Sequence, residues 1–126
     1  MKTSSKKGKG RRLQNHVRDE LLVNFSNSGL EEDDIKAAIM GESGEDIKLS
    51  PAARKVIPFS FECKNQERLN IWSSLKQAED NCSGRTPVLI FKRNRSEVYA
   101  TIKLEEFLKL IGGKNWNILM KLIMML

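Results

Sequence analysis

The chain has 126 residues, of which 40% are hydrophobic, which suits one globular domain and is too short for two ordinary ones. Its two cysteines exclude a disulfide framework, and the apolar run over residues 116–126 is shorter than the roughly 20 residues that cross a bilayer. The basic start is not followed by an apolar segment of the secretory type, so we expect a cytoplasmic protein with no membrane partner.

The net charge of +6 comes entirely from the beginning of the chain. Residues 1–12 contain no acid and six bases, namely Lys2, Lys6, Lys7, Lys9, Arg11 and Arg12. Together with the glycines and serines around them, these bases predict a flexible basic arm over residues 1–12. Such an arm suits a polyanion because it releases counterions from phosphates, although a solubilising leader would have the same composition.

The rest of the chain predicts alternating helices and strands. A helix is expected over residues 13–28, where apolar residues recur every four positions, and Gly29 ends it. Strands are then expected over 46–49 and 57–64, a helix over 69–81 with Trp72 on its packing side, strands over 87–92 and 98–103, and a helix over 104–111. This order predicts an α/β fold with a central mixed β-sheet flanked by helices, in a domain over residues 13–111. The apolar tail over residues 112–126 is expected to pack on its own domain or on a second copy.

The expected strand over residues 57–64 carries the most informative pattern in the chain. Apolar and polar residues alternate strictly along it, so that Glu62 and Lys64 share one face while Cys63 lies on the other. Asp46, on the preceding strand, is a second carboxylate that a hairpin could bring beside Glu62. Carboxylate oxygens are the ligands that Mg²⁺ prefers, and a nearby lysine can orient water or stabilise charge on a phosphate. Glu20 flanks the apolar side of the first helix and is a third acid within expected reach.

These residues resemble the motif of the PD-(D/E)xK nuclease superfamily. The matching segments are Gly44-Glu45-Asp46-Ile47 and Phe61-Glu62-Cys63-Lys64, behind a helix that carries Glu20. The likeness is greatest to small phage-type members and to archaeal Holliday-junction resolvases, and it covers roughly residues 13–111. The proline of the family name is absent, because Glu45 precedes Asp46, and Glu45 is an alternative ligand. Since Ile47 looks core-facing, the alternation favours Asp46.

The resemblance implies a restriction-endonuclease-like core and a complete set of site residues. By this likeness, Asp46 and Glu62 bind Mg²⁺, for which Mn²⁺ would substitute, the Cys63 carbonyl adds a ligand, and Lys64 assists the water. Glu20 would be the first-helix glutamate, and Gln77 would be the glutamine that many members carry on the helix after the motif strand. The expected activity is that of a metal-dependent endodeoxyribonuclease resolving branched DNA as a homodimer, in a phage or prokaryotic host cell.

Further cations are expected to contact DNA beside this site. Besides the arm residues Lys6, Lys7, Lys9, Arg11 and Arg12, they are Arg54 and Lys55 between the site strands, and Lys92, Arg93 and Arg95 at a turn. Three alternatives stay open: a sequence-specific or homing-type endonuclease on the same core, a non-catalytic DNA-binding module, and an assembly protein that uses the apolar tail.

Overall fold

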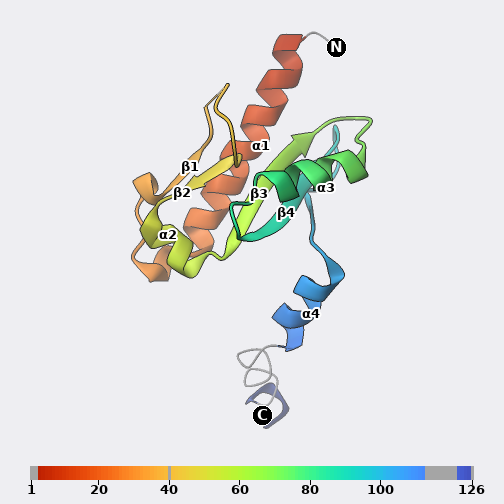
Figure 1. Ribbon diagram of the computed structural model, residues 1–126. Helices are drawn as coiled ribbons and strands as arrows, with labels where there is room; N and C mark the ends of the chain where they lie inside the picture. The colour runs from red at the N-terminus through yellow and green to blue at the C-terminus, as the bar shows by residue number, and fades with distance from the viewer. Residues whose placement is uncertain (1–2, 40, 113–121, 126) are drawn as a thin grey trace.

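A computed structural model describes residues 3–39, 41–112 and 122–125. The fold is mixed α/β and contains two small sheets (Figure 1). The first is an antiparallel hairpin, and the second is a mixed sheet in which the central strand pairs parallel on one side and antiparallel on the other. The strands in chain order are β1 Ile35–Ala37, β2 Ile47–Leu49, β3 Phe59–Asn65, β4 Thr86–Lys92 and β5 Tyr99–Thr101.

The predicted strands after residue 40 are confirmed, with small shifts at their ends. Between β2 and β3 the chain forms a short helix, α2 Pro51–Val56, in which the Ser50 hydroxyl accepts a hydrogen bond from the Ala53 N–H. Helix α3 spans Ile71–Asp80, with Asn70 as its N-cap. A last helix, α4, spans Leu104–Gly112. The acidic run before β1 is a 3₁₀ turn over Glu32–Asp34, closed by a reciprocal capping box.

The first helix corrects the prediction of a flexible arm. Helix α1 spans Thr3–Asn24, so residues 3–12 are helical and continue the helix that was expected to begin at Leu13. A helix that is already nucleated and packed extends at little cost through lysine and arginine, which are good helix formers. Glycine lowers helix propensity, and Gly8 and Gly10 are the residues that made this stretch look like an arm.

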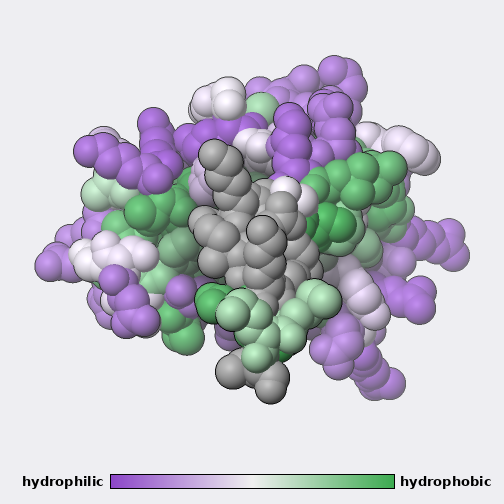
Figure 2. Space-filling view, turned by 90° about the horizontal axis from the view of Figure 1, so that it is seen from below, coloured by the Kyte–Doolittle hydropathy of each residue, from purple (hydrophilic) through white to green (hydrophobic). Residues whose placement is uncertain are grey.

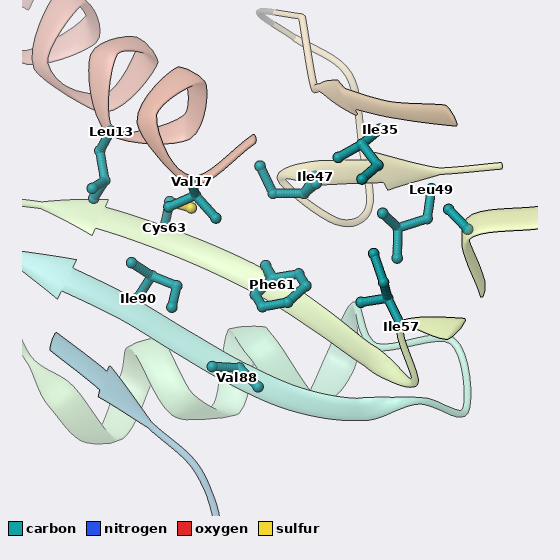
Figure 3. Packing of buried hydrophobic residues seen from close by; sticks show 11 residues of the cluster. Leu13, Val17, Ile35, Ile47, Leu49, Ile57, Phe61, Cys63, Val88 and Ile90 are labelled. Carbon is teal, nitrogen blue, oxygen red and sulfur yellow. The ribbon is translucent and has the colours of Figure 1, made fainter. Parts of the chain in front are cut away.

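The core lies between α1 and the strands (Figure 3). Leu13 and Val17 of α1 pack against Phe61 and Cys63 of β3, while the isoleucines and leucine of the β1–β2 hairpin extend the cluster toward Ile57. The hairpin is joined to β3 by a hydrogen bond of 3.1 Å from the Asp46 N–H to the Phe61 carbonyl. The start of β2 is thereby fixed beside the middle of the motif strand.

Helix α3 covers the opposite face of β3 and β4. Ser74 and Ala78 are its buried residues, and small side chains there let the helix approach the sheet closely. Glu62 therefore lies under a helix rather than at an open surface. Trp72 was predicted to pack, but this is wrong: it is 83% exposed, because it lies on the outer side of the first turn of α3.

Helix α4 extends away from the body and exposes much of its apolar surface (Figures 1 and 2). Its exposed large hydrophobic residues are Leu104, Phe107, Leu108 and Leu110. Most of the tail that was predicted to pack lies outside the described residues. The described segment 122–125 is helical and exposed. Among the helices that the structure describes, none is both long and apolar enough to cross a membrane.

Candidate functional site

A hollow of about 690 Å³ lies where the end of β3, the start of β2, α1 and α3 meet. Four of the five predicted catalytic residues line it: Asp46, Glu62, Lys64 and Gln77. Cys63 also lines it, and so do Lys6 and Lys9 from the helical segment that replaced the predicted arm. The remaining lining residues are Gly10, Gln14, Asn65, Gln66, Glu67 and Arg68.

Asp46 is held against the motif strand by its side chain as well as by its backbone. Its Oδ2 accepts a hydrogen bond of 2.7 Å from the Cys63 N–H. The N–H and C=O of an extended residue point to the same side of a strand, so the Cys63 carbonyl also faces Asp46. Burial raises the pKa of Asp46, against the opposing effects of the Cys63 hydrogen bond and the Lys64 charge. The carboxylate is thus fixed in place at an electrostatic cost.

Glu62 is the more strongly perturbed carboxylate. Only 2% of it is exposed, and its oxygens lie 3.9 Å from Lys64 Nζ and 3.4 Å from Asn81 Nδ2. Burial, followed by repulsion from Asp46, raises the pKa of Glu62 to about 7. Asp46 thus raises the pKa of its neighbour Glu62, and such a carboxylate pair is a common signature of a functional site, because a cation between the two groups would relieve the repulsion.

Glu45, the alternative ligand, points away from this hollow. Its carboxylate forms a buried ion pair with the Arg85 guanidinium, and Arg85 Nε also donates to the Phe59 carbonyl over 3.3 Å. Successive residues of an extended chain face opposite sides, so anchoring Glu45 turns Asp46 toward Glu62. The preference for Asp46 over Glu45 agrees with this arrangement.

The structure does not bring Glu20 to the other acids. Glu20 lines a separate, mainly apolar hollow with His16, on the side of α1 that faces Tyr99. Gly10 and Gln14 are the α1 residues that, together with Asp46, line both the main hollow and a second, smaller one. The spacing of Lys6, Gly10 and Gln14 at four-residue steps would have indicated this face, had the helix been extended toward the N-terminus.

The predicted DNA contacts divide by position. Lys6 and Lys9 line the main hollow, whereas Lys7 and Arg11 line a second hollow of about 220 Å³ beyond Asp46. Lys92 and Arg93 line a third hollow next to the 66–67 loop. The other predicted contacts line none of these three hollows; they are Arg12, Arg54, Lys55 and Arg95.

The donor set of the main hollow is suited to a hard cation with few protein ligands. In the part of the chain that is described, no group of three or more His, Cys, Asp or Glu side chains is placed to hold a metal ion. Mg²⁺ commonly binds through one or two carboxylates and otherwise takes water and phosphate oxygens, so Asp46 and Glu62 fit it. Burial raises the pKa of the Cys63 thiol, which opposes a thiolate ligand or nucleophile there.

The hollow also contains one unsatisfied buried acceptor. Asn65 Oδ1 is inaccessible to solvent and accepts no hydrogen bond within the described part of the chain. Such a buried group normally has a hydrogen-bond partner.

No protein-family model matches the chain, and no curated protein or solved structure matches it either. Inference about function therefore depends on the residues themselves and on their arrangement around this hollow.

Proposed function

We propose that the protein is a Mg²⁺-dependent endodeoxyribonuclease that hydrolyses phosphodiester bonds in the hollow around Asp46 and Glu62. The observation that carries the proposal is the convergence of two neighbouring carboxylates, a lysine and the Gln77 amide in one hollow bordered by cations of α1. Those cations would attract a phosphate group. The two carboxylates would repel the same phosphate unless a metal ion balanced the negative charges.

In this proposal, Asp46 and Glu62 hold the ion, and the Cys63 carbonyl supplements them. A divalent ion bound there would supply Lewis-acid polarisation of the phosphate and lower the pKa of bound water. Lys64 Nζ, 3.9 Å from Glu62, donates hydrogen bonds toward the attacking water or the phosphoryl oxygens. The Gln77 amide orients the substrate from α3. Lys6 and Lys9 hold the DNA backbone across the hollow.

The order of elements supports a restriction-endonuclease-like core. Helix α1 precedes three strands, the short α2 lies between the second and the third, and α3 connects β3 to its parallel neighbour β4. Glu62 is on β3, Asp46 directly precedes β2 and is hydrogen-bonded to β3, and the connection places α3 over the motif strand. Strands position a site more rigidly than loops do, which is what a metal centre requires.

Branched DNA, such as a four-way junction, is the substrate that we propose, with a homodimer supplying two sites. A two-fold substrate is matched by two copies of the chain. The exposed apolar surface of α4 is available to such an association. A sequence-specific endonuclease on the same core is the alternative enzyme.

The test is cleavage of labelled four-way junctions and linear duplexes with Mg²⁺ or with chelator. Wild-type protein is expected to cut the junction only with the ion. Glu62→Gln is expected to abolish cleavage, and Lys64→Ala to lower its rate by roughly 10²–10³-fold. Glu79→Gln, which removes a carboxylate of α3 that lies outside the hollow, is the matched control and should cut at the wild-type rate.

The outcomes separate the candidate functions. Cleavage of one linear sequence alone would support the sequence-specific enzyme over the resolvase. Binding of DNA by the wild type without cleavage under any divalent ion would reject the nuclease and favour a non-catalytic DNA-binding module.

A further inference from the structure

The third hollow lies immediately beside the candidate active site and is built from a different kind of residue. It has a volume of about 370 Å³, within the range of ligand-binding pockets. Gln66 and Glu67 line both this hollow and the main one, so the two are separated only by the loop that follows β3. We call this third hollow the side pocket.

An aromatic pair forms one part of the side pocket. Phe91 of β4 and Tyr99 of β5 are register partners, and their rings stack with centroids 5.9 Å apart at 28°. Tyr99 is 56% exposed, although an aromatic ring on a strand is normally covered. Leu69 and Ile71 supply apolar surface from the segment leading into α3. The pocket therefore offers a ring face and aliphatic side chains to a flat, weakly polar ligand.

Cations and a fixed loop complete the side pocket. Lys92 and Arg93 line it, against the single acid Glu67. Glu67 is already engaged, because its Oε1 accepts a hydrogen bond of 3.0 Å from the Asn94 N–H. The Gln66 N–H donates to the Lys92 carbonyl over 3.1 Å, so the loop and the basic turn hold each other in place. Ring surface and positive charge together match a nucleotide, whose base stacks and whose phosphate binds cations.

We propose that the side pocket binds an unpaired nucleotide of the DNA substrate, with its base on the Tyr99 ring and its phosphate on Lys92 and Arg93. Bases inside a duplex stack on their neighbours, so only a nucleotide at a branch, flap or bulge can offer a free face. The proposal deepens the proposed nuclease function and depends on it for the identity of the ligand. Recognition of a branch would then take place in a pocket next to the cleaved bond.

The test measures binding in chelator, so that no cleavage occurs. Two fluorescent duplexes of the same sequence are compared, one fully paired and one with a single unpaired adenine, by anisotropy titration of the full chain. Wild-type protein is expected to bind the bulged duplex more tightly. Tyr99→Leu, which keeps apolar bulk on the strand, should weaken that complex by about 5- to 150-fold and leave the paired duplex unchanged. Tyr99→Phe keeps the ring and should bind both like the wild type.

Arg93→Ala supplies a second readout that a structural role of Tyr99 would not produce. It should weaken the bulged duplex more than the paired one and make the logarithmic dependence of the bulged duplex's affinity on salt less steep, by about 0.9 for one lost phosphate contact. If Tyr99→Leu loses affinity for both duplexes equally, or loses none, the side-pocket proposal is overturned. The nuclease proposal is not affected by that result. A preference for the bulged duplex that depends on Tyr99, together with no cleavage of four-way junctions or linear duplexes in Mg²⁺, would uphold the pocket and reject the nuclease. Absence of DNA binding by the wild type would reject both.

Discussion

Replacing Glu62 by glutamine should stabilise the metal-free protein at neutral and alkaline pH. The folded protein raises the pKa of Glu62 from 4.5 to about 7, chiefly because the carboxyl group is buried beside Asp46. Between these two values the folded chain keeps a proton that the unfolded chain has lost. The free energy of unfolding therefore falls as the pH rises through this window and levels off above it.

The size of the effect follows from the same two values. Each pH unit corresponds to about 1.4 kcal/mol, so the ionised Glu62 lowers wild-type stability at pH 8 by about 3 kcal/mol. Glutamine has a similar shape, carries no charge and can still accept from Asn81. We expect Glu62→Gln to be more stable than the wild type by up to this amount at pH 8 in chelator, with most of the difference gone at pH 5.

Urea denaturation followed by circular dichroism at the two pH values measures this difference. Glu79→Gln, which removes a half-exposed carboxylate outside the hollow, controls for the loss of one negative charge. Mg²⁺ at pH 8 should stabilise the wild type and leave Glu62→Gln almost unchanged, an effect that requires no catalysis. A difference between variant and wild type that is the same at both pH values would refute the reasoning, and so would a variant that is less stable at pH 8.

Three further outcomes are expected. Arg85→Ala leaves the buried Glu45 carboxylate without its partner and should lower the free energy of unfolding by about 3–5 kcal/mol, measured by urea denaturation against Arg54→Ala on the exposed side of α2. Ile57→Ala empties a fully buried position and should cost about 2–5 kcal/mol in the same assay, with Ile57→Val costing less than half of that. Lys6→Ala combined with Lys9→Ala should reduce the salt dependence of DNA affinity by about two phosphate contacts, read from anisotropy titrations over a range of salt concentrations.

The strands were predictable because local patterns and tertiary packing agree along them. The alternation around Glu62 identified β3, and the apolar run before Lys92 identified β4. The parallel pairing of these two strands brings Glu62 under α3, where both faces are covered. Alternation alone could not show that the polar face is buried, because this depends on the crossover helix.

The site was predictable where its residues share neighbouring strands, and not where a helix had to be placed. Asp46, Glu62 and Lys64 meet because Asp46 donates a backbone hydrogen bond to the Phe61 carbonyl of β3 and its carboxylate accepts one from the Cys63 N–H. Glu20 was expected near them, but the rotation of α1 is set by Leu13 and Val17, which turn Glu20 to the other side. Gln14 was missed because the helix was predicted to begin at Leu13, so the face that Gln14 shares with Lys6 and Gly10 was not recognised.

The continuous path of α1 determines how the positive charge is presented. Lys6 and Lys9 are on the same helix as Leu13, which is buried in the core. An unstructured arm would lose backbone entropy of about 1–2 kcal/mol for each residue that it orders on a polyanion. In this protein the folding of the domain has already ordered the backbone of these residues, so the electrostatic affinity for a polyanion is not reduced by that entropy loss. The helix thus holds the cations in a fixed position beside the carboxylates, and a polyanion would meet them as a preformed surface.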